Sequence, residues 1–160
     1  MRRAVLLLGL VLVAGCGGGD STTEDTPLPG PGKILYAGVD WAVVVDGNTA
    51  AAYHLVDGKW HADRSGKVRI DILGPKPGEL APNPPQVAIS MHSKTPLVES
   101  ALWVDDLRLF EKGGGSPTNG TIYGAPANPL EPGRHVAVGY ARTATAGTAV
   151  AWVFQSPKNG

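Results

Sequence analysis

Cysteine occurs only once in this sequence of 160 residues, at position 16, which excludes an intrachain disulfide and a disulfide-stapled fold. An excess of charge is also missing: 14 basic residues balance 14 acidic ones, so the basic surface expected of a nucleic-acid-binding protein is absent. The apolar run over residues 4–14 is shorter than the ~20 residues that a membrane-spanning helix needs. Glycine and proline are plentiful, with 22 and 14 residues, which is typical of a loop-rich globular chain.

The first residues of the chain have the layout of an export signal. Arg2 and Arg3 precede the apolar run, which has the length of a signal-peptide core. The run ends in Val13-Ala14-Gly15-Cys16, which resembles the lipobox of bacterial lipoproteins. This resemblance implies that residues 1–15 are removed, that Cys16 carries the lipid, palmitate included, and that the protein is anchored outside the cytoplasm to the bacterial cell membrane. The alternative is a plain secretory signal whose cleavage site contains a cysteine by chance.

The segment after Cys16 is predicted to be a flexible tether. Residues 17–32 are mostly glycine, proline, threonine and acidic residues, and Leu28 is their only large apolar side chain. Such a composition cannot bury enough apolar surface to offset the entropy lost on ordering. We therefore expect a disordered tether over residues 16–32 and one domain over residues 33–160.

The hydrophobic pattern of this domain has the period of two that is typical of β-strands. Large apolar side chains alternate with polar or smaller ones over residues 67–72, 87–92, 135–140 and 149–154. Glycine or proline interrupts nearly every run of a dozen residues, which disfavours helices. The pattern predicts antiparallel strands with one buried face each.

Turn residues divide the rest of the domain into short segments. Between them, strands are predicted over residues 41–45, 50–56 and 59–62 as a meander. The predicted turns and loops are Asp46-Gly47, Asp57-Gly58, Ser65-Gly66, Gly113-Gly114-Gly115 after a strand ending at Phe110, and Asn119-Gly120. Many short strands with turns at this spacing favour a sandwich or a barrel.

Four segments of the second half carry a family resemblance. They are Gly74-Pro75-Lys76-Pro77-Gly78, Pro85-Gln86-Val87-Ala88-Ile89, Ala101-Leu102-Trp103-Val104-Asp105-Asp106, and Pro129 to His135 with the closing strand Ala151-Trp152-Val153-Phe154. Together they resemble the bacterial immunoglobulin-like domains, which include fibronectin-type and surface-protein modules. The resemblance implies an all-β fold: an antiparallel immunoglobulin-like β-sandwich over residues 67–156 with an N-terminal β-meander extension over residues 33–66.

His135 is expected at a corner of this sandwich. In the family an aromatic residue two positions after a glycine plugs the corner, and His135 stands in that place after Gly133, hydrogen-bonded to backbone. The apolar residues Val136, Val138 and Tyr140 alternate with it, so they lie on the other face of the strand. Either the strand has another register or this face is covered, and the meander is the segment available to cover it.

The histidines suggest a weak metal-site hypothesis. His54 and His61 flank the Asp57-Gly58 turn, and with Met91 and His92 they offer the nitrogen and sulfur ligands of a soft metal. The segment from Pro77 to Val87 also resembles the opening of copper-binding sandwich proteins. Those proteins bind copper through a histidine at the mature N-terminus, where this chain has Cys16. Surface or core histidines without metal are the alternative that the spacing favours, and no cofactor is expected.

No catalytic motif stands out, so we expect a protein that is not an enzyme. The sequence has no Gly-x-Ser-x-Gly elbow, no His-Glu-x-x-His and no P-loop. Asp105 and Asp106 are adjacent, which on a strand would turn them to opposite faces, and a turn is their expected place.

The aromatic residues suggest a binding surface. We expect Trp152 and at least one of Trp41 and Trp60 in the core, which leaves Trp103 and Tyr123 as the better exposed candidates for ligand binding. The expected function is a lipid-anchored module for adhesion or assembly with a protein or cell-wall partner. The alternative is an extracytoplasmic small-ligand or copper-type metal-binding protein.

Overall fold

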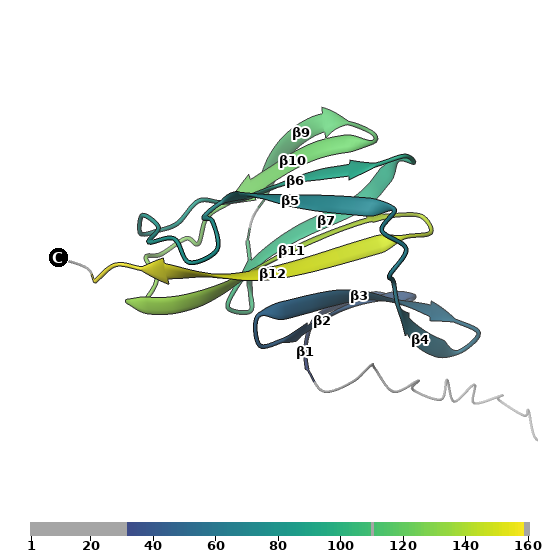
Figure 1. Ribbon diagram of the computed structural model, residues 1–160, viewed down its shortest axis with the longest axis horizontal. Coiled ribbons are helices and arrows are strands. Elements are labelled where there is room, and N and C mark those ends of the chain that lie inside the picture. Colours follow the sequence, from purple (N-terminus) through teal and green to yellow (C-terminus); the bar gives the residue numbers. More distant parts are fainter. Residues whose placement is uncertain (1–31, 110, 159–160) are drawn as a thin grey trace, which may run out of the picture.

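A computed structural model describes residues 32–109 and 111–158 as three stacked antiparallel β-sheets (Figure 1). Each sheet has four strands, and the described residues contain no helix. The expected all-β, sandwich-type fold is confirmed. We call the three layers the meander, the middle sheet and the upper sheet, after their order from bottom to top in Figure 1.

The meander consists of strands that pair in chain order, β1-β2-β3-β4. Their bounds are β1 (Lys33–Ala37), β2 (Trp41–Asp46), β3 (Thr49–Val56) and β4 (Lys59–Ala62). Asp57 and Gly58 join β3 to β4 with φ angles of 50° and 71°, the left-handed values that a two-residue type I′ turn requires. The three strands predicted here are confirmed, and β1 precedes them.

The upper and middle sheets form the sandwich. The upper sheet has the order β5 (Val68–Gly74), β6 (Val87–Ser93), β10 (Asn119–Gly124) and β9 (Lys112–Ser116). The middle sheet has the order β12 (Gly147–Ser156), β11 (Gly133–Thr143), β7 (Leu97–Val104) and β8 (Leu107–Arg108). The chain passes between the two sheets after β6, after β8 and after β10, so strands distant in sequence become neighbours.

Two hydrophobic cores separate the three layers. Between the upper and middle sheets lie the large apolar side chains of Ile89, Leu102, Trp152 and Phe154 with their neighbours. Between the middle sheet and the meander lie Trp41, Val43, Ala52, Ala101, Trp103, Val138, Tyr140 and Ala149. The middle sheet is therefore buried on both faces, which explains its long runs of apolar residues.

Strand β11 shows how the sequence serves both cores. Ala137 faces the upper sheet, and so does Gly139, where a β carbon would lie 3.0 Å from Ile89. The alternate residues Val138 and Tyr140 face the meander. Of the two alternatives given above for this strand, another register or a covered outer face, the second is confirmed. The strand keeps its ordinary register, and the meander covers its outer face.

Two local predictions were wrong. Ser65-Gly66 is not a hairpin turn, because β4 and β5 belong to different sheets and this pair lies in the connection between them. Residues 113–115 form part of strand β9 and not a loop, while Asn119 and Gly120 begin β10. Gly113 passes so close to β10 that a β carbon there would lie 2.2 Å from the Thr121 carbonyl oxygen. These glycines therefore permit strand pairing. Phe110 lies outside the described residues.

Candidate functional site

A groove of about 310 Å³ lies where the meander meets one end of the middle sheet. Strands β1, β2 and β11 supply its walls, and the turns after β2 and β7 supply its rim. The lining residues are Lys33, Leu35, Val45, Gly47, Asp105, Asp106, Val136 and Val138. The volume falls in the lower range of small-molecule sites in proteins, which are mostly apolar with a few polar groups.

The walls of the groove are apolar because two sheets face each other across it. Leu35 on β1 and Val45 on β2 come from the meander, while Val136 and Val138 come from alternate positions of β11. All four also border the core between these layers. The groove is thus the open end of a hydrophobic interface, and its shape depends on how the meander packs against the middle sheet.

The rim carries charge in the turn between β7 and β8. Asp105 and Asp106 have φ angles of 52° and 106°, so both residues are in the left-handed region. The expectation that this pair forms a turn is confirmed. Lys33 forms an ion pair with Asp106 across the groove. Both side chains are more than half exposed, so this pair itself contributes little to stability.

His135 lies directly behind this turn, and its side chain is only 8 % exposed. Its Nδ1 atom is 2.6 Å from Oδ2 of Asp105, and its Nε2 atom is 2.7 Å from the carbonyl oxygen of Glu131. The other carboxylate oxygen of Asp105 accepts a hydrogen bond of 2.9 Å from the backbone N–H of Val136. The backbone hydrogen bond expected for His135 is present. The contact with Asp105 was not predicted, because thirty residues separate the two and only the pairing of β7 with β11 brings them together.

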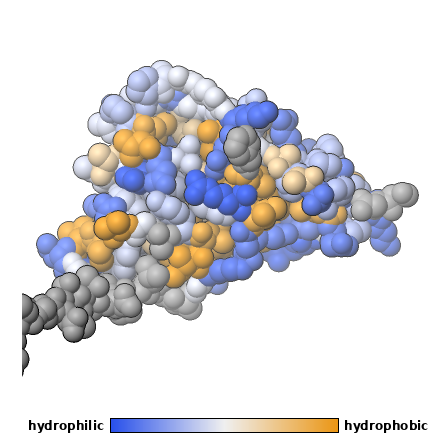
Figure 2. Space-filling view, turned by 180° about the vertical axis from the view of Figure 1, so that it is seen from behind, coloured by the Kyte–Doolittle hydropathy of each residue, from blue (hydrophilic) through white to orange (hydrophobic). Residues whose placement is uncertain are grey.

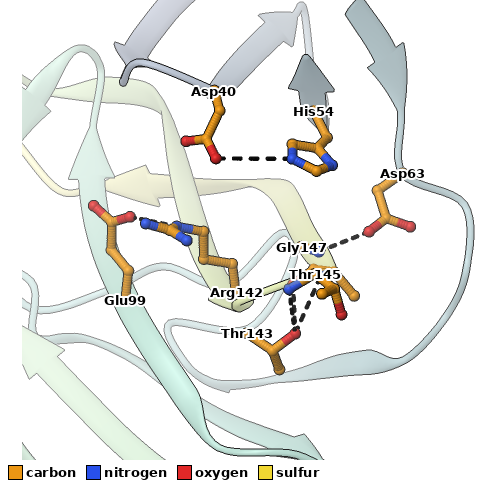
Figure 3. Close-up of polar contacts among 9 residues, drawn as sticks. Asp40, His54, Asp63, Glu99, Arg142, Thr143, Thr145 and Gly147 are labelled. Carbon is orange, nitrogen blue, oxygen red and sulfur yellow. Dashed lines mark hydrogen bonds and ion pairs between the residues drawn. The ribbon is translucent and has the colours of Figure 1, made fainter. Parts of the chain in front are cut away.

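A second group of polar residues joins the meander to the middle sheet at the interface shown in Figure 3. The ring of Trp41 stacks on that of His54, with centroids 4.4 Å apart, and the Arg142 guanidinium lies 5.8 Å from the Trp41 ring. Arg142 donates a hydrogen bond of 2.7 Å to Glu99, while Asp40 is 3.8 Å from His54. These contacts hold β2 and β3 against β7 and β11, so we assign the group a structural role.

Asp63 extends this junction to the start of β12. Its two carboxylate oxygens accept hydrogen bonds of 2.7 Å from the backbone N–H groups of Ser65 and Gly147. Partial burial acts to raise the pKa of Asp63, but these hydrogen bonds outweigh it and hold the pKa below its usual value. The side chain therefore ties the connection between β4 and β5 to the hairpin of β11 and β12 (Figure 3).

The four candidate metal ligands do not meet in one place. His54 and His61 are paired across β3 and β4 in the meander. Met91 is buried in the core between the upper and middle sheets, while His92 lies 3.4 Å from Asp71 in the upper sheet. The middle sheet separates these two pairs. Among the residues that the structure describes, no three His, Cys, Asp or Glu side chains are grouped to hold a metal ion.

The two aromatic candidates have different surroundings. Trp103 was expected to be exposed, and this is wrong: it is 2 % exposed, because the meander covers the face of the middle sheet on which it lies. Tyr123 is 39 % exposed on β10 of the upper sheet, as expected. The burial of Trp152 and Trp41 is confirmed. Cys16, the predicted lipid attachment site, lies outside the described residues.

No family model matches this chain, and no curated protein matches it. In the part of the chain that the structure describes, no helical segment has the length and hydropathy needed to cross a bilayer. The assignment of function therefore depends on the chemistry of the residues themselves.

Proposed function

We propose that this chain is an exported bacterial lipoprotein, anchored through Cys16, whose β-sandwich binds a partner outside the cytoplasm without catalysing a reaction. Arg2, Arg3, the apolar run and Val13-Ala14-Gly15-Cys16 support the anchor. Several acyl chains on one cysteine would hold the protein firmly, whereas a single chain binds a membrane only reversibly. The tether over residues 16–32 would then place the meander, whose first residue is Lys33, nearest to the anchor.

We further propose that the sandwich is immunoglobulin-like. If β5 to β12 are lettered A, B, C, C′, D, E, F and G, the upper sheet has the order ABED and the middle sheet the order GFCC′. This order supports the proposal, because ABED opposite CFG is the arrangement of constant-type immunoglobulin domains. The segment before β6 also runs parallel to β12, with Leu80 bridged to Gln155. The meander over the outer face of the middle sheet is an addition to this arrangement.

The groove between the meander and the middle sheet is the observation that carries the binding function. Its walls are apolar, its rim is charged, and it lies at the junction of two layers. Exposed apolar side chains also occur on the meander, among them Ile34, Val39 and Val56. Figure 2 shows the molecule from behind, and hydrophobic surface is visible in the lower part of this view, over the meander and its junction with the sandwich. We infer that the partner contacts this part of the molecule.

A photo-crosslinking experiment in intact cells tests the partner-binding function. A photoreactive phenylalanine analogue would replace Leu35 in the groove, and in a control strain it would replace Leu73, which is exposed on β5 of the upper sheet. We expect a discrete crosslinked product from position 35 that position 73 does not form. The same products from both positions, or none from position 35, would contradict the groove as the binding site.

A small ligand is the second candidate, and the size of the groove favours it. Thermal unfolding of the full chain in detergent micelles would be recorded with cell-wall sugars, Ca(II), Zn(II) and Cu(II). A ligand at a hundred times its dissociation constant adds ~2.7 kcal/mol of stability. A ligand bound in the groove should raise the unfolding temperature. We expect Val45→Lys in the groove wall to abolish this rise, and Val56→Lys on the same sheet to retain it. If a metal ion raises the unfolding temperature in both variants but not in His54→Ala, the result would indicate a histidine site instead.

A further inference from the structure

Three chain connections meet at the end of the molecule opposite the groove. They are the segment between β4 and β5, the turn between β6 and β7, and the turn between β11 and β12, which lie on the right in Figure 1. Between them is an open hollow of about 500 Å³, lined by Ser65, Gly66, Lys67, Lys94, Thr95 and Thr145. A second hollow of about 340 Å³ adjoins it over β5 and β6 and shares Gly66, Lys67 and Lys94. Strand β7 begins at this end of the molecule and ends at the groove.

Among the described residues, no acidic side chain lines either hollow. Val68 pairs with Ser93 across β5 and β6, and the same register places Lys67 opposite Lys94. Arg69 adds a third positive charge on the same face of β5. Like charges directly opposite each other destabilise a sheet, so this pairing is unfavourable for the fold itself. Such a local conflict is typical of a functional site. We call Lys67, Arg69 and Lys94 with the two hollows the basic end.

Two carboxylates close to the basic end are already engaged. Asp71 accepts a hydrogen bond of 3.2 Å from Nε of Arg69. Asp63 accepts hydrogen bonds from two backbone N–H groups, and Lys67 acts on it through its charge without forming an ion pair. In the part of the chain that the structure describes, neither Lys67 nor Lys94 forms an ion pair. Both lysines are exposed, so their charges attract anions from outside the chain.

The hollows keep their shape through contacts that do not involve the lysine side chains. Asp63 joins the connection between β4 and β5 to the start of β12 (Figure 3). In the turn after β11, the Thr143 hydroxyl accepts a hydrogen bond of 3.3 Å from the backbone N–H of Thr145. In the turn after β6, the Ser93 hydroxyl donates to the carbonyl oxygen of Thr95. A ligand therefore meets an ordered surface whose ammonium groups and hydroxyls can donate to phosphate oxygens.

We propose that the basic end binds the phosphate groups of anionic lipids in the membrane that carries the anchor. The contact rests on the proposed anchor at Cys16 and goes beyond it, because it gives the domain one orientation. Strand β7 runs from the basic end to the groove. A domain docked in this way therefore turns the groove away from the membrane, where a partner can reach it.

The length of the tether permits this orientation. The tether joins the domain at Lys33, beside the groove, so it must run past the domain to the membrane. The sixteen residues between Cys16 and Lys33 can span at most ~55 Å. The eight residues of β7, which separate the basic end from the groove, span only ~26 Å. The anchor also holds the domain at a high effective concentration beside the bilayer, so a few positive charges are sufficient for docking.

Paramagnetic relaxation enhancement measured by nuclear magnetic resonance tests the contact. The acylated chain, purified from membranes, would be placed in bicelles of phosphatidylcholine alone or with phosphatidylglycerol, each with a gadolinium chelate on some headgroups. The amide protons of Gly66 and Thr95 should relax about twofold faster or more in the anionic bicelles, because the anionic lipids hold the basic end near the headgroups. Gly47, beside the groove, should show no such increase. High salt should remove the difference, because it screens exposed charges. Equal relaxation of Gly66 and Thr95 in both bicelles would overturn the proposal.

Charge reversal separates the basic end from the overall charge of the protein. The double variant Lys67→Glu with Lys94→Glu should lose the faster relaxation in anionic bicelles. Because it keeps a like-charged pair at exposed positions, its unfolding temperature should match that of the parent chain. The matched control reverses the charge of two other exposed lysines, Lys59→Glu with Lys112→Glu, which lie in β4 and β9 and line neither hollow. This control should keep the faster relaxation, and the same loss in both variants would refute the proposal.

The remaining outcomes identify which part of the argument fails. Glycerol phosphate added to neutral bicelles tests a soluble phosphate as the ligand. If it shifts the Gly66 and Thr95 signals while anionic bicelles do not speed their relaxation, the membrane contact is refuted. Mass spectrometry that finds no acyl chains on Cys16 would refute both the anchor and the membrane contact. An acylated chain with equal relaxation in both bicelles would leave the anchor standing and refute the contact alone. Crosslinking from position 35 tests the groove independently.

Discussion

The ring of Trp41 lies directly against Gly147, where a β carbon would be 2.5 Å from ring atom Cζ3. Trp41 belongs to β2 of the meander, and Gly147 is the first residue of β12 in the middle sheet. Because Gly147 has no side chain, this tryptophan of the interface can approach the backbone of the sandwich closely. The packing of the meander on the middle sheet is therefore sensitive to a single methyl group added at Gly147.

Replacing Gly147 with alanine should therefore destabilise the protein. A methyl group at 2.5 Å from a buried ring forces the meander to shift, which costs about 1–3 kcal/mol of unfolding free energy. Chemical denaturation of the full chain, followed by tryptophan fluorescence, measures the change. Gly114→Ala is the matched control, because nothing lies within 4 Å of a β carbon at that position and we expect no loss of stability there. Equal losses in both variants would show that the contact with Trp41 is not the cause.

The ion pair between Arg142 and Glu99 should show a measurable coupling energy. Both side chains are about four-fifths buried and 2.7 Å apart, and Arg142 also contacts the Trp41 ring. A double-mutant cycle with Arg142→Ala and Glu99→Ala should give about 1 kcal/mol, above the value of a fully exposed pair. The same cycle on the exposed pair of Arg69 and Asp71 should give a smaller value. A coupling near zero for Arg142 and Glu99 would mean that the cation–ring contact alone positions Arg142.

The stability contributed by Asp63 should be lost in acid. The hydrogen bonds from Ser65 and Gly147 hold the pKa of Asp63 below its usual value in the folded protein. A carboxylate with a lowered pKa stabilises the fold at pH values above its unfolded pKa, near 3.9, and this contribution disappears as the pH falls through the folded pKa. Asp63→Asn should thus be less stable than the parent chain at pH 7, and the difference should shrink below pH 4. A difference that does not change between pH 7 and pH 3 would contradict the role of the charge.

Replacing Cys16 with serine should release the protein from the membrane or leave it unprocessed. Serine offers no sulfur for lipid attachment, and without the acyl chains the apolar anchor is lost. Cell fractionation followed by immunoblotting measures both the location and the size of the product. Ser21→Ala in the predicted tether is the matched control and should remain in the membrane fraction. A membrane-bound product of mature size from Cys16→Ser would refute the lipoprotein proposal.

The strands were predictable because the alternation of apolar and polar residues directly indicates which face of a strand is buried. Residues 68–72 and 87–91 each present one apolar face to a core, and both became strands at the expected places. The turn at Asp57-Gly58 was predictable from local backbone chemistry. The triple glycine was not, because glycine permits both a loop and a closely paired strand, and only the approach of β10 decides between them.

The parts of the candidate groove come from segments that no sequence pattern links. Lys33 and Asp106 are far apart in the chain, and their contact depends on the meander folding back over the middle sheet. The exposure of Trp103 was misjudged for the same reason, because its environment is set by meander residues such as Trp41 and Ala52, which lie far earlier in the chain. His135 could be placed at a corner, but its partner Asp105 could not be identified.

The sequence by itself determined the class of fold and the positions of most strands, and it left two alternatives for strand β11, another register or cover on its outer face. These features are local, because they depend on period, turn residues and composition. The tertiary structure alone decided which layer covers which face, which side chains line the groove and which acceptors surround His135. Those relationships arise from packing between distant strands, where small differences in shape and burial select one arrangement among several that share the same local pattern.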